Sequence, residues 1–150
     1  MSAWIVDASV AVKWVVREAG SDAAAALRGE ELHAPDWILI ECANVLWAKV
    51  RRRELTREEA DRGMALLIEA PITLAPASEL VAEALALAHE LAHPVYDCLY
   101  LALARARNSP LVTADARFVS AVRGSGLYDA PIRALGEPEA AGRVMEGEGP

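Results

Sequence analysis

Short apolar runs alternate with longer stretches of helical periodicity along this chain. The apolar runs are each too short for a helix and cover residues 3–6, 32–34, 72–74, 111–113 and 132–135. The longer stretches predict helices over about 21–27, 37–53, 56–70, 78–91, 96–107 and 116–123. Strands that alternate with helices favour right-handed crossovers, so we expect a three-layer α/β/α domain whose central parallel sheet has four to five strands.

Polar residues at the starts of these helices indicate where they begin. Thr56 and Glu59 have the spacing of a capping box, in which each side chain accepts a hydrogen bond from the other residue's backbone N–H. Asp36 and Ser78 precede two further helical stretches, and we expect each to cap the helix that follows it.

Composition limits the class of protein. The chain has 150 residues, is 54% hydrophobic and has two cysteines, which is typical of one domain with a sizeable core and excludes a disulfide scaffold. The first residues lack the basic region of a signal peptide, so we expect a cytoplasmic protein. We expect the domain to cover 1–136, and an acidic, flexible tail to follow over 137–150.

The net charge of −7 argues against a protein that coats nucleic acid through overall positive charge. A compact basic group nevertheless ends the predicted helix over 37–53. It consists of Lys49, Arg51, Arg52 and Arg53. These side chains have two interpretations that stay open: a solvated helix end, or a surface that binds RNA phosphates.

Four acidic residues follow or border the predicted strands. Asp7 follows the first strand and Asp115 the fourth, while Glu41 and Asp97 lie near the starts of two helices. Ligands of parallel α/β sheets bind beyond the carboxyl ends of the strands, so all four side chains can face one rim. Taken singly, Asp7, Asp97 and Asp115 are better explained as helix caps or first-turn acids than as site residues, but this explanation is weaker for the four acids together.

Together the four acids predict a cation site. Clustered carboxylates repel one another and cannot all ionise unaided. Mg²⁺ or Mn²⁺ prefers oxygen ligands and lowers the pKa of bound water. The residues therefore indicate metal-assisted hydrolysis of a phosphodiester.

Four sequence segments also resemble the successive motifs of PIN domains, and most closely those of VapC-type toxins from bacterial toxin–antitoxin pairs. The resemblance covers about residues 3–135. Its segments are Val6-Asp7-Ala8-Ser9, Glu41-Cys42-Ala43-Asn44-Val45-Leu46, Tyr96-Asp97-Cys98-Leu99-Tyr100-Leu101-Ala102-Leu103-Ala104, and Thr113-Ala114-Asp115 with Phe118.

The resemblance implies a Mg²⁺- or Mn²⁺-dependent endoribonuclease that leaves 5′-phosphate and 3′-hydroxyl ends. By motif match, the catalytic and metal-binding acids would be Asp7, Glu41, Asp97 and Asp115, and the supporting polar residues Ser9, Asn44 and Thr113. It also implies an RNA substrate, a homodimer and a cognate VapB-type antitoxin. A housekeeping RNA-processing PIN nuclease stays open as an alternative.

A competing motif is His89-Glu90-x-x-His93, which on a continuous helix would place two imidazoles on one face for Zn²⁺, as in a metallopeptidase. Pro94 follows directly, so we favour a helix end whose polar residues suit the dipole. Residues 10–16, Trp37 and Trp47 are candidates for a dimer or antitoxin surface, with burial in the core as the alternative.

Overall fold

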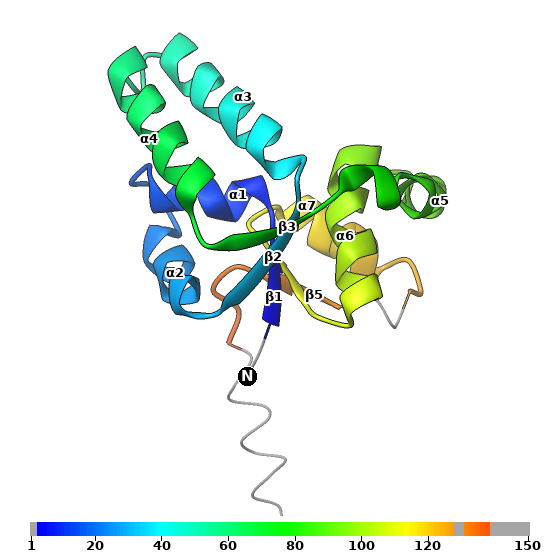
Figure 1. Ribbon diagram of the computed structural model, residues 1–150. Helices are drawn as coiled ribbons and strands as arrows, with labels where there is room; N and C mark the ends of the chain where they lie inside the picture. Colours follow the sequence, from blue (N-terminus) through cyan, green and yellow to red (C-terminus); the bar gives the residue numbers. More distant parts are fainter. Residues whose placement is uncertain (1–2, 128–130, 139–150) are drawn as a thin grey trace, which may run out of the picture.

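The centre of the molecule is a sheet of parallel strands. The computed structural model describes residues 3–127 and 131–138, and within them five parallel strands form one sheet in the order β3-β2-β1-β4-β5 (Figure 1). The strands are β1 (Ala3–Val6), β2 (Glu31–Pro35), β3 (Ile72–Ala75), β4 (Leu111–Thr113) and β5 (Ile132–Ala134). The predicted parallel α/β sheet is confirmed.

Helices cover both faces of this sheet, as Figure 1 shows, with α1 to α4 on one side and α5 to α7 on the other. They are α1 (Ala8–Ala11), α2 (Ser21–Ala26), α3 (Ile38–Arg51), α4 (Arg57–Glu69), α5 (Val81–Leu91), α6 (Val95–Arg107) and α7 (Ala116–Arg123). Short 3₁₀ turns add Val12–Trp14, Leu27–Gly29 and Ala77–Glu79. Right-handed crossovers run in one direction across the sheet from β1 through β2 to β3, and in the other direction from β3 to β4 and β5, so their helices cover opposite faces.

The core lies on both faces of the central strands. Ile5 and Val6 of β1 are fully buried, as are Val10 and Val12 just beyond it. Much of the apolar 10–16 segment is therefore core. Cys42 and Cys98 are also buried, and burial raises the pKa of their thiols to about 12 and about 11, which leaves both uncharged at neutral pH.

Of the three helix starts predicted from capping residues, the capping box is confirmed, and the two single-residue caps are wrong. Thr56 and Glu59 form the predicted capping box at α4. Asp36 instead accepts a hydrogen bond from the backbone N–H of Ala77, at 3.0 Å, and α3 begins without a side-chain cap. The 3₁₀ turn that contains Ser78 likewise leaves α5 without one.

The predicted tail over 137–150 lies outside the described residues apart from Glu137 and Pro138. Glu137 pairs with Arg123 of α7 at 2.8 Å, so the described chain ends against the domain. Among the described residues, no helix combines the length and the apolar character needed to cross a bilayer.

Candidate metal centre

Asp7 is a buried carboxylate at the end of β1. Its Oδ1 accepts hydrogen bonds from the Ser9 hydroxyl and from the backbone N–H of Val10, at 3.2 Å, so that Asp7 caps α1. Its Oδ2 accepts a hydrogen bond from the Thr113 hydroxyl. The residue is only 7% exposed. Burial raises its carboxyl pKa to about 6, against the opposing effect of these hydrogen bonds.

Ser9 and Thr113 join the ends of β1 and β4. The backbone N–H of Ala114 donates to the Ser9 hydroxyl at 2.9 Å, and the N–H of Asp115 donates to the Thr113 hydroxyl at 3.1 Å. Both residues thus orient Asp7 and fix the turn that carries Asp115, in line with the supporting role implied by the resemblance.

Glu41 reaches the same rim from the first turn of α3. Its Oε1 accepts a hydrogen bond from the hydroxyl of Tyr100, which lies on α6 and is buried. Burial, together with the negative charges of Asp97 and Asp7, raises the pKa of the Glu41 carboxyl to about 7, against the opposing effect of the Tyr100 hydrogen bond. Sequence reasoning missed Tyr100, although its position three residues after Asp97 places both on one face of α6.

Asp97, Asp115 and His93 form the second half of the cluster. One ligand atom from each lies within 4.8 Å of the other two. Asp97 Oδ2 is 2.6 Å from His93 Nε2, while Asp115 Oδ1 accepts the N–H groups of Arg117 and Phe118 and so caps α7. Asp115 therefore serves as helix cap and as cluster member, and the two explanations of this acid do not exclude each other.

The zinc-peptidase geometry does not form. Helix α5 ends at Leu91, because Ala92 adopts a left-handed conformation with φ 51° and ψ 48°. His93 therefore lies beyond the helix, while His89 stays exposed on it, and the two rings do not share a helical face. The helix-end interpretation fits the backbone of both residues, because His89 lies in the last turn of α5 and the His93 N–H donates to the Ala88 carbonyl at 3.2 Å. It did not anticipate that the His93 ring would face Asp97.

Comparisons with known proteins identify the family of this chain. Residues 4–124 match the PIN domain. The chain belongs to the PIN-domain family. It is 35% identical over 115 residues to Ribonuclease VapC3 of Pyrobaculum aerophilum, a match that covers 74% of this chain and 88% of that protein.

Two solved VapC structures show the same PIN fold. The sarcin–ricin-loop-cleaving toxin VapC20 of Mycobacterium tuberculosis has a TM-score of 0.61 and 16% identity, covering 79% of this chain and 94% of that one. VapBC2 of Rickettsia felis, bound to a promoter DNA fragment, has a TM-score of 0.58 and 11% identity, covering 88% and 98%.

The residues at the rim of this PIN domain fit a divalent cation. Octahedral ligands about 2.1 Å from a metal stand about 3.0 Å apart when adjacent and about 4.2 Å apart when opposite. One donor atom each from His93, Asp97 and Asp115 lies within 4.8 Å of the other two, so small movements of these side chains would bring the three atoms to such separations. Asp7 and Glu41 add carboxylates whose pKa values rise through burial and mutual charge, which is the repulsion that a bound cation would remove.

Asn44 differs from the other supporting residues. It is exposed on α3 and lines a surface pocket with Glu41 and Tyr96, whose ring stacks on Trp37 at 5.5 Å between centroids. Among the hydrogen bonds of the described residues, none joins Asn44 to the four acids.

The basic group lies at the opposite end of α3 from Glu41. Lys49 bridges Glu18 at 2.8 Å and Glu54 at 3.4 Å, and Arg52 pairs with Glu54 at 2.6 Å. Arg51 lies over the Trp47 ring, at 5.4 Å from its centroid. Intramolecular partners thus already occupy Lys49, Arg51 and Arg52.

Proposed function

We propose that this PIN domain is a Mg²⁺- or Mn²⁺-dependent endoribonuclease and the toxin of a toxin–antitoxin pair. The convergence of Asp7, Glu41, Asp97 and Asp115 from four separate segments is the observation that supports the proposal most. The 35% identity to Ribonuclease VapC3 supports RNA as the substrate class.

The rim residues would divide the chemistry between them. Asp7, Asp97 and Asp115 would hold the cation, which when bound lowers the pKa of water and offsets negative charge on a phosphate. We assign to Glu41 the removal of a proton from the attacking water, since its carboxylate reaches the rim from α3, close to Asp7 and Asp97. Hydrolysis adds the water oxygen to phosphorus and breaks the bond to the 3′ oxygen, which takes up a proton.

Replacement of one acid tests this assignment. Asp97→Asn should abolish cleavage of a labelled RNA while far-ultraviolet circular dichroism stays unchanged, because the amide keeps the shape but not the charge. Glu90→Gln changes an exposed residue of α5, is the matched control, and should cleave as wild type does. Normal cleavage by Asp97→Asn would remove this acid from the mechanism, and an inactive Glu90→Gln would show that loss of cleavage is not specific to the rim acids.

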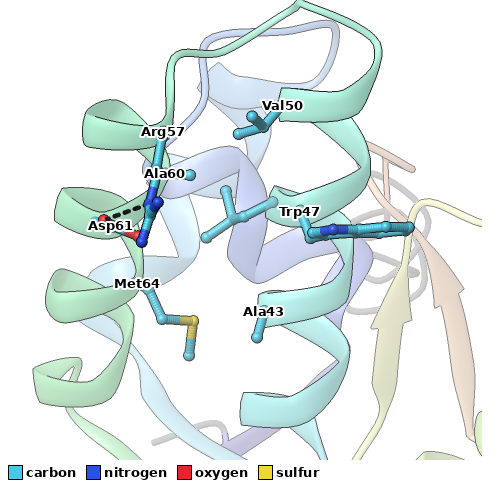
Figure 2. Close-up of a pocket in the computed structure, with 8 residues that line it drawn as sticks. Ala43, Trp47, Val50, Arg57, Ala60, Asp61 and Met64 are labelled. Atoms are coloured by element: carbon cyan, nitrogen blue, oxygen red, sulfur yellow. Dashed lines mark ion pairs between the residues drawn. The ribbon is translucent and has the colours of Figure 1, made fainter.

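A groove between α3 and α4 is our candidate surface for a VapB-type antitoxin. Figure 2 shows Ala43 and Val50 of α3 facing Ala60 and Met64 of α4, while the ring of Trp47, which also lines the groove, extends from α3 to the side away from α4. Its volume is about 460 Å³, and the metal-site acids do not line it. Trp47 is 58% exposed there, and an exposed large aromatic side chain beside an apolar groove is typical of a protein-binding surface.

The groove has a direct test with the product of the neighbouring gene, which for a toxin is expected to be a small DNA-binding protein with a short tail. Trp47→Glu should weaken its binding at least about tenfold in isothermal titration, because a hot-spot aromatic contributes about 2 kcal/mol or more. Ile68→Glu changes a residue of similar exposure, 60%, outside this groove and should bind as wild type does. Equal affinities of wild type and Trp47→Glu would exclude this surface, and absence of such a gene would favour the housekeeping nuclease.

Three further predictions remain part of the proposal. The first concerns RNA contacts by the basic group, which consists of Lys49, Arg51, Arg52 and Arg53. If these side chains bind RNA phosphates, Arg53→Ala should make the salt dependence of RNA affinity shallower.

The second and third concern the homodimer and the cytoplasmic location. Light scattering after size exclusion checks the homodimer. Cell fractionation checks the cytoplasmic location.

A further inference from the structure

His93 is held at the acidic rim by two elements. The left-handed Ala92 turns the chain out of α5, and Pro94 precedes α6, so His93 stands between the two helices. The ring of Phe118 lies 4.6 Å from the His93 ring, centroid to centroid, and fixes its orientation. Phe118 is buried on α7, the helix that Asp115 caps, so the same element positions Asp115 and the imidazole.

The position of the imidazole matches that of a ligand. His93 Nε2 lies 2.6 Å from Asp97 Oδ2, and His93, Asp97 and Asp115 each have a donor atom within 4.8 Å of the others. Two adjacent ligands of one octahedral ion are about 3.0 Å apart, so a cation can replace the proton shared by His93 and Asp97 with little movement.

We propose that His93 is a nitrogen ligand of the metal centre and that it makes this centre prefer Mn²⁺ to Mg²⁺. The inference rests on the proposed metal site and adds a ligand that the motif match does not contain. Mg²⁺ binds oxygen donors almost exclusively, whereas imidazole nitrogen strengthens binding of first-row transition metals. A site of carboxylates alone lacks this source of discrimination.

Pulsed electron paramagnetic resonance of the full chain loaded with Mn²⁺ tests the ligand directly. Wild type should show hyperfine coupling from a directly bound imidazole nitrogen, and His93→Gln should lose it. His89→Gln, which changes an exposed histidine on α5, should keep the coupling. Mn²⁺ that binds wild type without nitrogen coupling would overturn the inference, as would coupling that survives His93→Gln.

Affinities separate a ligand from a residue that only orients Asp97. The side-chain amide introduced by His93→Gln can still donate a hydrogen bond to Asp97, so a purely orienting role would leave both metal affinities near those of wild type. A ligand role predicts that Mn²⁺ affinity falls at least about tenfold and Mg²⁺ affinity by much less. Equal losses for the two metals would contradict the proposed preference.

Failure of the proposed function would look different. Asp97→Asn removes a carboxylate from the same cluster and should weaken both metals in isothermal titration. If wild type and Asp97→Asn bind Mn²⁺ equally, the metal centre itself is wrong, and with it both proposals. If Asp97→Asn weakens metal binding but His93→Gln binds both metals as wild type does, the nuclease proposal stands and the proposal of a nitrogen ligand is wrong.

Discussion

Glu41 carries a proton at a pH at which exposed glutamates are ionised. Its carboxyl pKa rises from 4.5 to about 7 because burial and the charges of Asp97 and Asp7 disfavour ionisation. The folded state therefore binds this proton more tightly than the unfolded chain does. It follows that the free energy of unfolding decreases as the pH rises through the interval from 4.5 to about 7.

Glu41→Gln should accordingly stabilise the protein in EDTA at about pH 8, by about 2 kcal/mol, and should have little effect at about pH 4, where both states of wild type are protonated. Urea unfolding at the two pH values measures this difference. Glu90→Gln should change neither value, since Glu90 is exposed and outside the cluster. If Glu41→Gln is less stable than wild type at about pH 8, the charge of Glu41 does not destabilise the metal-free protein, and the account of this residue is wrong.

Single residues differ in how far the sequence predicts their roles. Asp7 follows β1 directly and Asp115 lies two residues beyond the end of β4, and the rule for parallel sheets brings them to one rim. Tyr100 was missed because its bond to Glu41 depends on how α3 and α6 are placed, which no local pattern encodes. The contact between His93 and Asp97 was missed because the direction of the His93 side chain depends on the backbone of Ala92.

At the scale of elements, the left-handed backbone of Ala92 ends α5 and directs His93 to the acidic rim. A non-glycine residue in the left-handed region is strained, so Ala92→Gly should stabilise the protein by about 0.5–1 kcal/mol. Ala86→Gly, exposed within the same helix, should destabilise it by about the same amount. Thermal unfolding of both variants measures the pair, and destabilisation by Ala92→Gly would indicate that α5 continues through His93.

Helix starts show where local sequence suffices. The Thr56–Glu59 capping box involves only residues within one turn, and its prediction is confirmed. The Asp36 side chain is equally suited to cap a helix, but it accepts a hydrogen bond from the distant Ala77 N–H instead. The two residues meet because β2 and β3 pair side by side up to Pro35 and Ala75. Competition from distant partners is therefore what local cap predictions omit.

At the scale of the whole molecule, alternation predicted the parallel sheet, but the sequence does not encode the strand order in any local pattern. β1 in the centre, with β4 beside it, brings Asp7 next to Thr113 across more than one hundred residues. The cluster is thus a property of the topology, and metal binding should stabilise the entire fold.

Added Mn²⁺ at about a hundredfold excess over its dissociation constant should raise the free energy of unfolding of wild type by about 2.7 kcal/mol. Asp7→Asn should show a much smaller gain, because the variant lacks one ligand. The matched control Glu90→Gln should gain as much as wild type. Equal gains for wild type and Asp7→Asn would count against Asp7 as a ligand.

The most direct measurement is anomalous diffraction from crystals of this protein soaked in Mn²⁺. We predict one dominant peak at the rim of the sheet, within coordination distance of Asp97 and Asp115 and beside Asp7 and Glu41. A well-diffracting soaked crystal with no peak among these carboxylates, or with its dominant peak elsewhere, would contradict the metal-dependent nuclease that we propose.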